Sequence, residues 1–134
     1  LESHRQAAPQ SAYVSSETVD VKTLDDVLPD AVVERGGVFV KIDTQGFTMQ
    51  VLKGASRTLT RCIGLQVELS MIRLYANEPL IEEIIQFLRE HDYRPVFIEP
   101  EFMDASGYQL QVNGLFLNAN TQVRGNATRA VLKS

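Results

Sequence analysis

VFVKIDTQGF, residues 38–47, is the stretch of the sequence that decides the fold. Its first five residues form an apolar run with one interruption, which is typical of a strand covered on both faces in a parallel α/β sheet. The run ends at Asp43, and Gly46 then lets the chain turn. Apolar residues follow at helical spacing, namely Met49, Leu52, Ala55 and Leu59. The stretch therefore predicts a strand, an acidic turn and a helix.

The segments on either side also alternate between strand and helix patterns. Residues 19–22 alternate as a short strand would, and residues 23–26 resemble a helix capping box, which predicts a brief helix over 24–28. Residues 65–69 predict a second strand, and residues 80–88 place leucine and isoleucine on one helical face. Because helices separate these strands, we expect them to be parallel.

Two further strands are predicted over 93–99 and 109–118, with no helical pattern between them. Strands without a crossover helix are best joined as an antiparallel pair, so the sheet should be mixed and the fold class α/β. Residues 14–118 are predicted to form the domain. Residues 1–13 are predicted to be a linker or disordered end, and 119–134 a flexible polar tail.

Composition and charge argue against several classes of binding partner, namely nucleic acids, membranes and metal ions. The 134 residues contain 13 Lys and Arg against 17 Asp and Glu, a net charge of −4, so no basic field exists for a nucleic acid. No apolar run approaches the ~18 residues of a membrane span. The one cysteine, Cys62, cannot form an internal disulfide, and no metal-ligand spacing occurs. We expect a cytoplasmic protein that binds neither nucleic acid nor membrane.

Asp43 is the first candidate for chemistry. Ligands of open α/β sheets collect beyond the carboxyl ends of the parallel strands, and Asp43 stands at such an end. Its carboxylate either bonds a ligand or accepts a proton from a nucleophile, or it caps the following helix. The spacing alone favours neither interpretation.

Glu68 and Tyr75 are weaker candidates. Glu68 interrupts an apolar strand, where a carboxylate either faces solvent near the strand end or pairs with a cation such as Lys41. Tyr75 precedes the long helix and either lines a cleft or covers the edge of the core. The structural interpretation is favoured for both residues when the pattern alone is considered.

Residues 41–47, KIDTQGF, and 51–55, VLKGA, carry a family resemblance. They resemble the FkbM-type methyltransferases, whose hallmark is Lys-Ile-Asp-Val-(Glu/Gln)-Gly-x-Glu with Val-Leu-x-Gly-Ala one turn later. Further stretches agree with the family in the same order: TLDDVL at 23–28, GLQVELS at 64–70 with LY at 74–75, EPEF at 99–102, and LQVNGLF at 110–116. The resemblance covers about residues 14–117, and Thr48 stands where the family usually has a second acid.

The resemblance implies a function that periodicity does not. The family is similar to class I methyltransferases, with a Rossmann-like sheet of seven strands whose last strand inserts antiparallel. Residues 38–42 and 65–69 would be the fourth and fifth strands. S-adenosylmethionine would be the methyl donor, and a small-molecule hydroxyl the acceptor. The resemblance implies a catalytic role for Asp43 and acceptor contacts for Gln45, Glu68 and Tyr75.

The family's glycine-rich cofactor loop has no counterpart in this sequence, so its cofactor-binding residues are unassigned. The resemblance therefore implies the C-terminal half of a catalytic domain, and we expect the isolated chain to be inactive. The alternative is a non-catalytic binding or dimerisation module derived from the same half-sheet. In either case the strand edge at 38–42 is expected to pair with a missing N-terminal half or with a second copy in a homo-oligomer.

Overall fold

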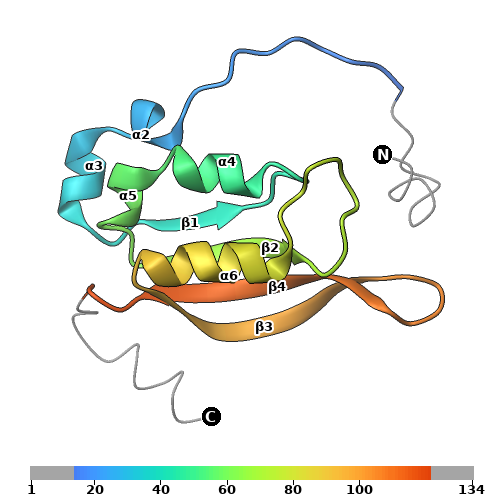
Figure 1. The fold of residues 1–134 in the computed structure, drawn as a ribbon. Helices are drawn as coiled ribbons and strands as arrows, with labels where there is room; N and C mark the ends of the chain where they lie inside the picture. Colours follow the sequence, from blue (N-terminus) through green and yellow to red (C-terminus); the bar gives the residue numbers. More distant parts are fainter. Residues whose placement is uncertain (1–13, 122–134) are drawn as a thin grey trace.

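The computed structural model describes residues 14–121, which form one sheet with helices packed against it (Figure 1). The predicted linker, 1–13, and residues 122–134 of the predicted tail lie outside the described residues. The elements in chain order are α2 (Leu24–Val27), α3 (Asp30–Arg35), β1 (Phe39–Ile42), α4 (Thr48–Lys53), α5 (Ser56–Leu59), β2 (Gly64–Ser70), α6 (Ile81–Glu90), β3 (Tyr93–Met103) and β4 (Gln109–Asn118).

The four strands follow the order β1-β2-β4-β3. β1 and β2 are parallel, and β4 is antiparallel to both β2 and β3. The predicted parallel pair, the antiparallel hairpin and the mixed sheet are thereby confirmed. The last strand lies between β2 and β3 rather than at the edge.

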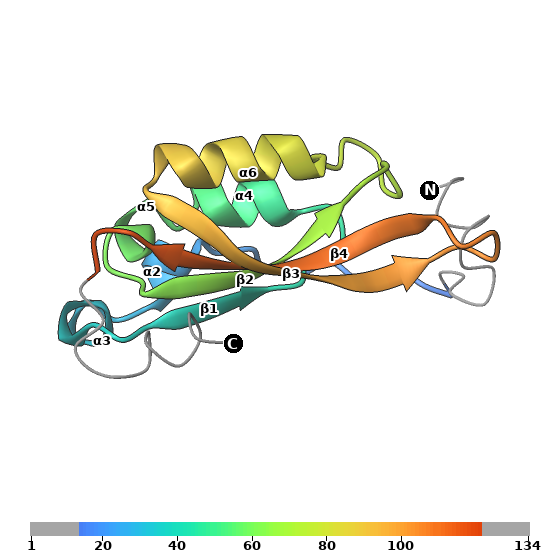
Figure 2. The same cartoon turned by 90° about the horizontal axis from the view of Figure 1, so that it is seen from below.

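Helices α4 and α6 lie over the same face of the sheet (Figure 2). The side chains of Leu65, Val67 and Leu69 in β2 point toward this face and are completely buried. From α6, Ile84 and Leu88 complete the same core, as the helical spacing predicts. The sheet therefore has its hydrophobic core on the side covered by these helices.

The face of β1 that points away from α4 and α6 is exposed, although the sequence predicts that it is covered. Phe39 is 45% exposed and Lys41 is exposed, whereas Ile42 is buried. The expectation that 38–42 is covered on both faces is therefore wrong for the described residues. An apolar run predicts burial but does not say which element supplies the cover.

β3 is the other edge strand, and it is irregular. Its pairing with β4 shifts register after Pro95 and again after Pro100. Proline has no backbone N–H, and both prolines and bulges are features that discourage a further strand from pairing at a sheet edge.

Two local predictions need correction, and one helix was not predicted. Residues 19–22 do not form a strand: Val19 and Val21 are 66% and 75% exposed, because alternation produces a strand only where another strand is available for pairing. The helix α3 was not predicted. The helix predicted from Met49 to Leu59 is broken into α4 and α5, because the Gly54 carbonyl accepts a hydrogen bond from the Asp25 amide (3.1 Å).

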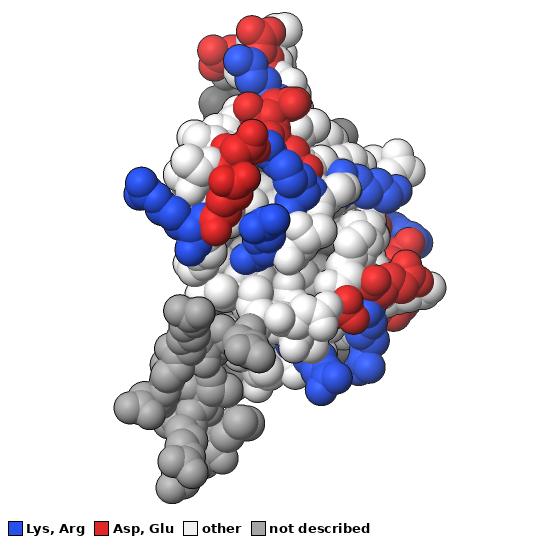
Figure 3. Space-filling view, turned by 90° about the vertical axis from the view of Figure 1, so that its left-hand side faces the viewer, with Lys and Arg blue, Asp and Glu red and all other residues white. Residues whose placement is uncertain are grey.

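Asp25 then caps the new helix α5. Its carboxylate accepts hydrogen bonds from the backbone N–H groups of Arg57 (2.7 Å) and Thr58 (2.9 Å) and from the Thr58 hydroxyl (2.8 Å). Desolvation opposes ionisation, but these hydrogen bonds and the Arg57 charge together lower the pKa of Asp25. The Arg57 guanidinium also pairs with Asp30, and charges of both signs interleave at this end of the molecule (Figure 3).

Candidate functional site

The candidate site lies at the carboxyl ends of the parallel strands β1 and β2. The last residues paired between them are Ile42 and Val67, so Asp43 and Glu68 follow on neighbouring strands. A turn, residues 43–47, leaves β1 here, and a loop, residues 71–80, leaves β2 at the same end. The prediction that Asp43 stands at the carboxyl end of a parallel strand is confirmed.

Asp43 does not cap the following helix. Helix α4 begins at Thr48, its N-cap is Phe47, and no side chain makes the capping hydrogen bond. The Asp43 carboxylate instead forms an ion pair with Lys41 at 3.2 Å and is 51% exposed. Of the two interpretations of Asp43, the helix cap is wrong, and the role as a ligand or proton acceptor stays a prediction.

Glu68 has an acid–base character different from that of an ordinary surface carboxylate. Its burial raises the pKa first, and the negative charges of Asp43, Glu101 and Glu78 raise it further, while Lys41 lowers it. Lys41 makes its ion pair with Asp43 rather than with Glu68. A carboxyl group with a raised pKa exchanges protons more readily near neutral pH.

Tyr75 packs against Gly46, the residue that follows Gln45. Gln45 and Gly46 both have positive φ angles, 29° and 88°, which form the sharp turn after Asp43. A Cβ atom placed on Gly46 would lie 2.7 Å from the Cβ atom of Tyr75, so only glycine fits here. The turn and the loop therefore touch, and three of the predicted site residues lie on these two segments.

Glu78 was missed by sequence reasoning. It lies in the loop after β2, is only 4% exposed, and accepts hydrogen bonds from Ser70 and from the backbone of Leu74 and Tyr75. No periodic signal marks it, and an acid directly before Pro79 was the one clue in the sequence. Thr48, at the family's acidic position, is 6% exposed in the first turn of α4.

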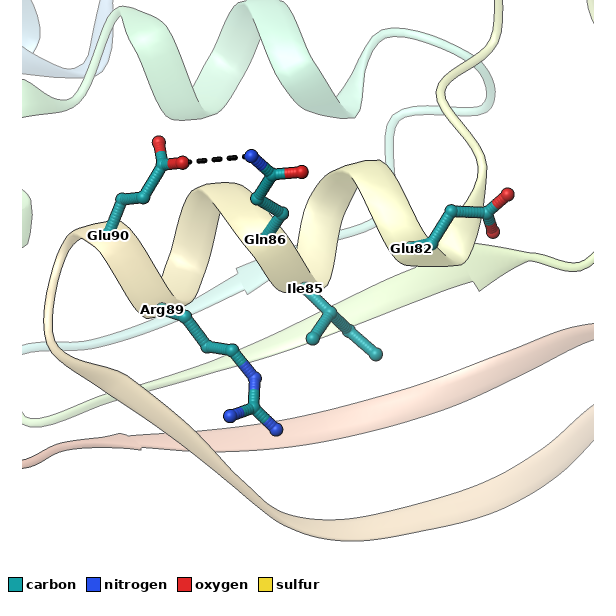
Figure 4. Close-up of a pocket in the computed structure, with 5 residues that line it drawn as sticks. All are labelled: Glu82, Ile85, Gln86, Arg89 and Glu90. Carbon is teal, nitrogen blue, oxygen red and sulfur yellow. Dashed lines mark hydrogen bonds between the residues drawn. The ribbon is translucent and has the colours of Figure 1, made fainter.

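Asp43 lines none of three hollows found among the described residues. One of about 480 Å³ follows a single face of α6, where the side chains of one helix supply the whole lining (Figure 4). One of about 130 Å³ lies over β2, β3 and β4, and one of about 550 Å³ lies between α4 and the loop 71–80. The candidate site is an exposed edge, and within residues 14–121 no three His, Cys, Asp or Glu side chains converge to hold a metal ion.

Comparison with known proteins decides the family. The model of the methyltransferase FkbM domain matches residues 2–95, more than half of the chain. The chain belongs to this family. The match includes the hallmark stretches 41–47 and 51–55 and ends just inside β3, so the similar stretches 99–102 and 110–116 lie beyond it.

No curated protein and no solved structure matches the chain significantly. Membership in the FkbM methyltransferase family rests on the domain match and agrees with the resemblance of the motifs. Within residues 14–121, every helix is too short or too polar to cross a bilayer.

Proposed function

We propose that this chain is the C-terminal, acceptor-side part of an S-adenosylmethionine-dependent O-methyltransferase. One observation carries the proposal. Asp43, in the family's hallmark stretch, ends a parallel strand with its carboxylate exposed and not used as a helix cap. Methyl transfer to oxygen needs a group that aligns the acceptor hydroxyl and takes its proton, and a carboxylate at this edge suits that task.

The order of the strands supports a class I, Rossmann-like architecture. In the family that the sequence resembles, the last strand inserts antiparallel, and here β4 lies antiparallel between β2 and β3. β1 and β2 would then be the fourth and fifth strands of a larger sheet. This assignment makes the exposed edge of β1 the place where the rest of such a sheet would continue.

The described residues fit one part of the methyl donor. S-adenosylmethionine, when bound, supplies a methyl group on a positively charged sulfur. The carboxylates of Asp43 and Glu68 suit a cation electrostatically. In residues 14–121 no glycine-rich turn follows a strand in the pattern that holds a nucleotide, so we propose that other residues hold that part of the donor.

The proposed reaction is an in-line displacement. The acceptor oxygen forms a bond to the methyl carbon while the bond from that carbon to sulfur breaks, and the electron pair of that bond stays on sulfur. Asp43 accepts the proton that the acceptor hydroxyl releases. Glu68 hydrogen-bonds the acceptor, and Gln45 and Tyr75 contact it from the turn and the loop. Lys41, 3.2 Å from Asp43, orients its carboxylate.

A second function is favoured by a different observation. β1 has an exposed side chain, Phe39, on the side of the sheet away from α4 and α6, and it is an edge strand among the described residues. These features suit a binding or dimerisation module that pairs along β1 with a second copy or with an N-terminal half. In that case the carboxylates at the strand ends have no catalytic task.

Transfer of a labelled methyl group separates the two functions. The protein at its full natural length is incubated with methyl-labelled S-adenosylmethionine and a deproteinised extract of small molecules, with heat-inactivated protein as the control. The methyltransferase proposal expects label in the small-molecule fraction, bound to oxygen. No transfer, together with no binding of S-adenosylmethionine in calorimetry, would contradict it and favour the module.

A further inference from the structure

Glu78 is a buried carboxylate that the proposed reaction does not use. Its side chain is 4% exposed, and it lies in the loop 71–80 between β2 and α6. Burying a carboxylate costs free energy unless hydrogen-bond donors surround it. The position of its donors therefore shows what the carboxylate holds in place.

The donors of Glu78 come from the end of β2 and from the middle of the loop. Oε1 accepts a hydrogen bond from Ser70 Oγ (2.7 Å), while Oε2 accepts from the backbone N–H groups of Leu74 (2.7 Å) and Tyr75 (3.2 Å). Ser70 Oγ in turn accepts from Gln111 Nε2 in β4 (3.3 Å). Hydrogen bonds to an ionised acceptor are about twice as strong as neutral ones. The network thus ties the middle of the loop to two strands of the sheet.

Closing the loop does not require these bonds. Its two ends already meet, because Ser70 and Leu80 form a parallel backbone bridge. Helix α6 has its own N-terminal cap, since the Leu80 N–H donates to Glu83 (2.8 Å). The contribution of Glu78 is therefore specific to the segment that contains Leu74 and Tyr75.

Tyr75 passes this restraint to the turn after β1. The Cβ atom of Tyr75 would lie 2.7 Å from an ideal Cβ atom placed on Gly46, so Gly46 has no room for a side chain. Gly46 belongs to the turn 43–47, which also contains Asp43 and Gln45. A loop that shifts at Tyr75 removes the surface against which this turn packs.

We propose that Glu78 is a positioning residue that couples the loop 71–80 to the turn 43–47 and so fixes the placement of Asp43 and Gln45. The coupling itself rests on contacts within the chain; only its meaning for an acceptor rests on the proposed function. Glu78 acts through Tyr75 and touches neither substrate nor donor.

Amide hydrogen exchange on the 134-residue chain tests the coupling. The informative amides are those of Leu74, which donates to Glu78, and of Phe47, which donates to the Thr44 carbonyl within the turn (3.0 Å). We expect Glu78→Ala to speed exchange at Leu74 by about tenfold and at Phe47 several-fold, because a hydrogen bond to a charged group is lost. Amides in the middle of β2 should exchange as before.

Two variants and one control sharpen the test. Glu78→Gln keeps an oxygen that can accept from Leu74 and Tyr75, so it should restore slow exchange at both sites. Ser70→Ala removes the donor to Oε1 and the acceptor of Gln111 Nε2 but keeps the bonds to Oε2, so it should speed exchange at the same two sites by a smaller factor. This variant replaces Glu78→Ala if Glu78→Ala does not fold. Glu90→Ala, which removes an exposed carboxylate bonded to Gln86 on α6, should change neither site.

Fast exchange at Leu74 with no change at Phe47 would overturn the coupling, and so would uniform acceleration over the whole sheet. Neither result depends on methyl transfer. Conversely, a chain that never binds S-adenosylmethionine but shows the expected exchange pattern refutes the proposed function and leaves the coupling standing.

Discussion

The pKa of a carboxyl group is shifted in opposite directions at the two ends of the parallel strands. At the amino end, Asp25 accepts three hydrogen bonds from Arg57 and Thr58, and its pKa is lowered. At the carboxyl end, Glu68 is half-buried near other negative charges, and its pKa is raised. Both residues lie in stretches that resemble the same family. Folding therefore stabilises the ionised form of Asp25, whereas it makes ionisation of Glu68 cost free energy.

Two stretches that resemble the family therefore supply acids with different roles in the structure. The stretch at 23–28 supplies Asp25, whose hydrogen bonds explain why the helix predicted after Gly46 is broken at Gly54. The stretch at 41–47 supplies Asp43, whose carboxylate makes no bond that the helix needs.

Replacing Asp43 should have the largest effect on activity. We expect Asp43→Ala in the natural full-length protein to lower the rate of labelled methyl transfer by about 10²-fold or more, the usual contribution of a general base. The affinity for S-adenosylmethionine, measured by calorimetry, should fall by a much smaller factor than the rate, because Glu68 still offers a carboxylate to the positively charged sulfur. Asp20→Ala, which removes an exposed carboxylate far along the chain from the site, is the matched control. A rate within twofold of the parent would remove Asp43 from the mechanism.

Replacing Asp25 should have the largest effect on stability. Asp25→Ala leaves the N–H of the buried Thr58 without its acceptor, and we expect the free energy of unfolding in urea to fall by about 2 kcal/mol. Because the pKa of Asp25 is lowered on folding, this contribution is present above its ordinary value of 3.8 and is lost as the pH falls through the folded value. Equal destabilisation by Asp43→Ala would erase the contrast between the two ends.

Replacing Glu68 should stabilise the fold at neutral pH. The folded chain binds a proton at Glu68 more readily than the unfolded chain, so stability is lost as the pH rises from 4.5 through the raised folded pKa. Glu68→Gln removes that loss, and we expect Tm at pH 7 to rise by about 2–4 °C. The gain should disappear below pH 4.5. A lower Tm at pH 7 would show that the charged form is stabilised by folding.

Replacing Lys41 should have the smallest effect on the free energy of unfolding. The side chains of Lys41 and Asp43 are 58% and 51% exposed, and ion pairs at such exposure contribute little. We expect Lys41→Ala to change the free energy of unfolding by less than about 0.5 kcal/mol in urea. A larger loss would mean that the carboxyl end of β1 is stabilised as strongly as the amino end near Asp25.

Much of the fold follows from pattern alone because the signals are local. The strand over 65–69, the helix that became α6 and the final hairpin are confirmed, since their periodicity and their intervening segments leave few alternatives. The errors depend on partners distant in the sequence. Residues 19–22 have the alternation of a strand, and the break at Gly54 depends on the distant amide of Asp25.

The candidate site was only partly accessible to sequence reasoning. A strand ending in an acid placed Asp43 at the carboxyl edge, but only the position of Phe47 as the N-cap of α4 excludes Asp43 as its cap. The contact of Gly46 with Tyr75 and the burial of Glu78 arise from folding of an irregular loop, for which no period exists. The roles of Asp43, Gln45, Glu68 and Tyr75 toward an acceptor stay predictions.

The prolines of β3 make the two edges of the sheet unequal as sites for a further strand. Pro95 and Pro100, with the register shifts beside them, discourage strand addition at that edge, whereas β1 offers a regular edge at the other side. Within residues 14–121, β1 is therefore the sheet edge at which further strands can pair. If two copies paired through their β1 edges, both regular edges would be used up, and the assembly would end at two copies rather than grow into a fibre.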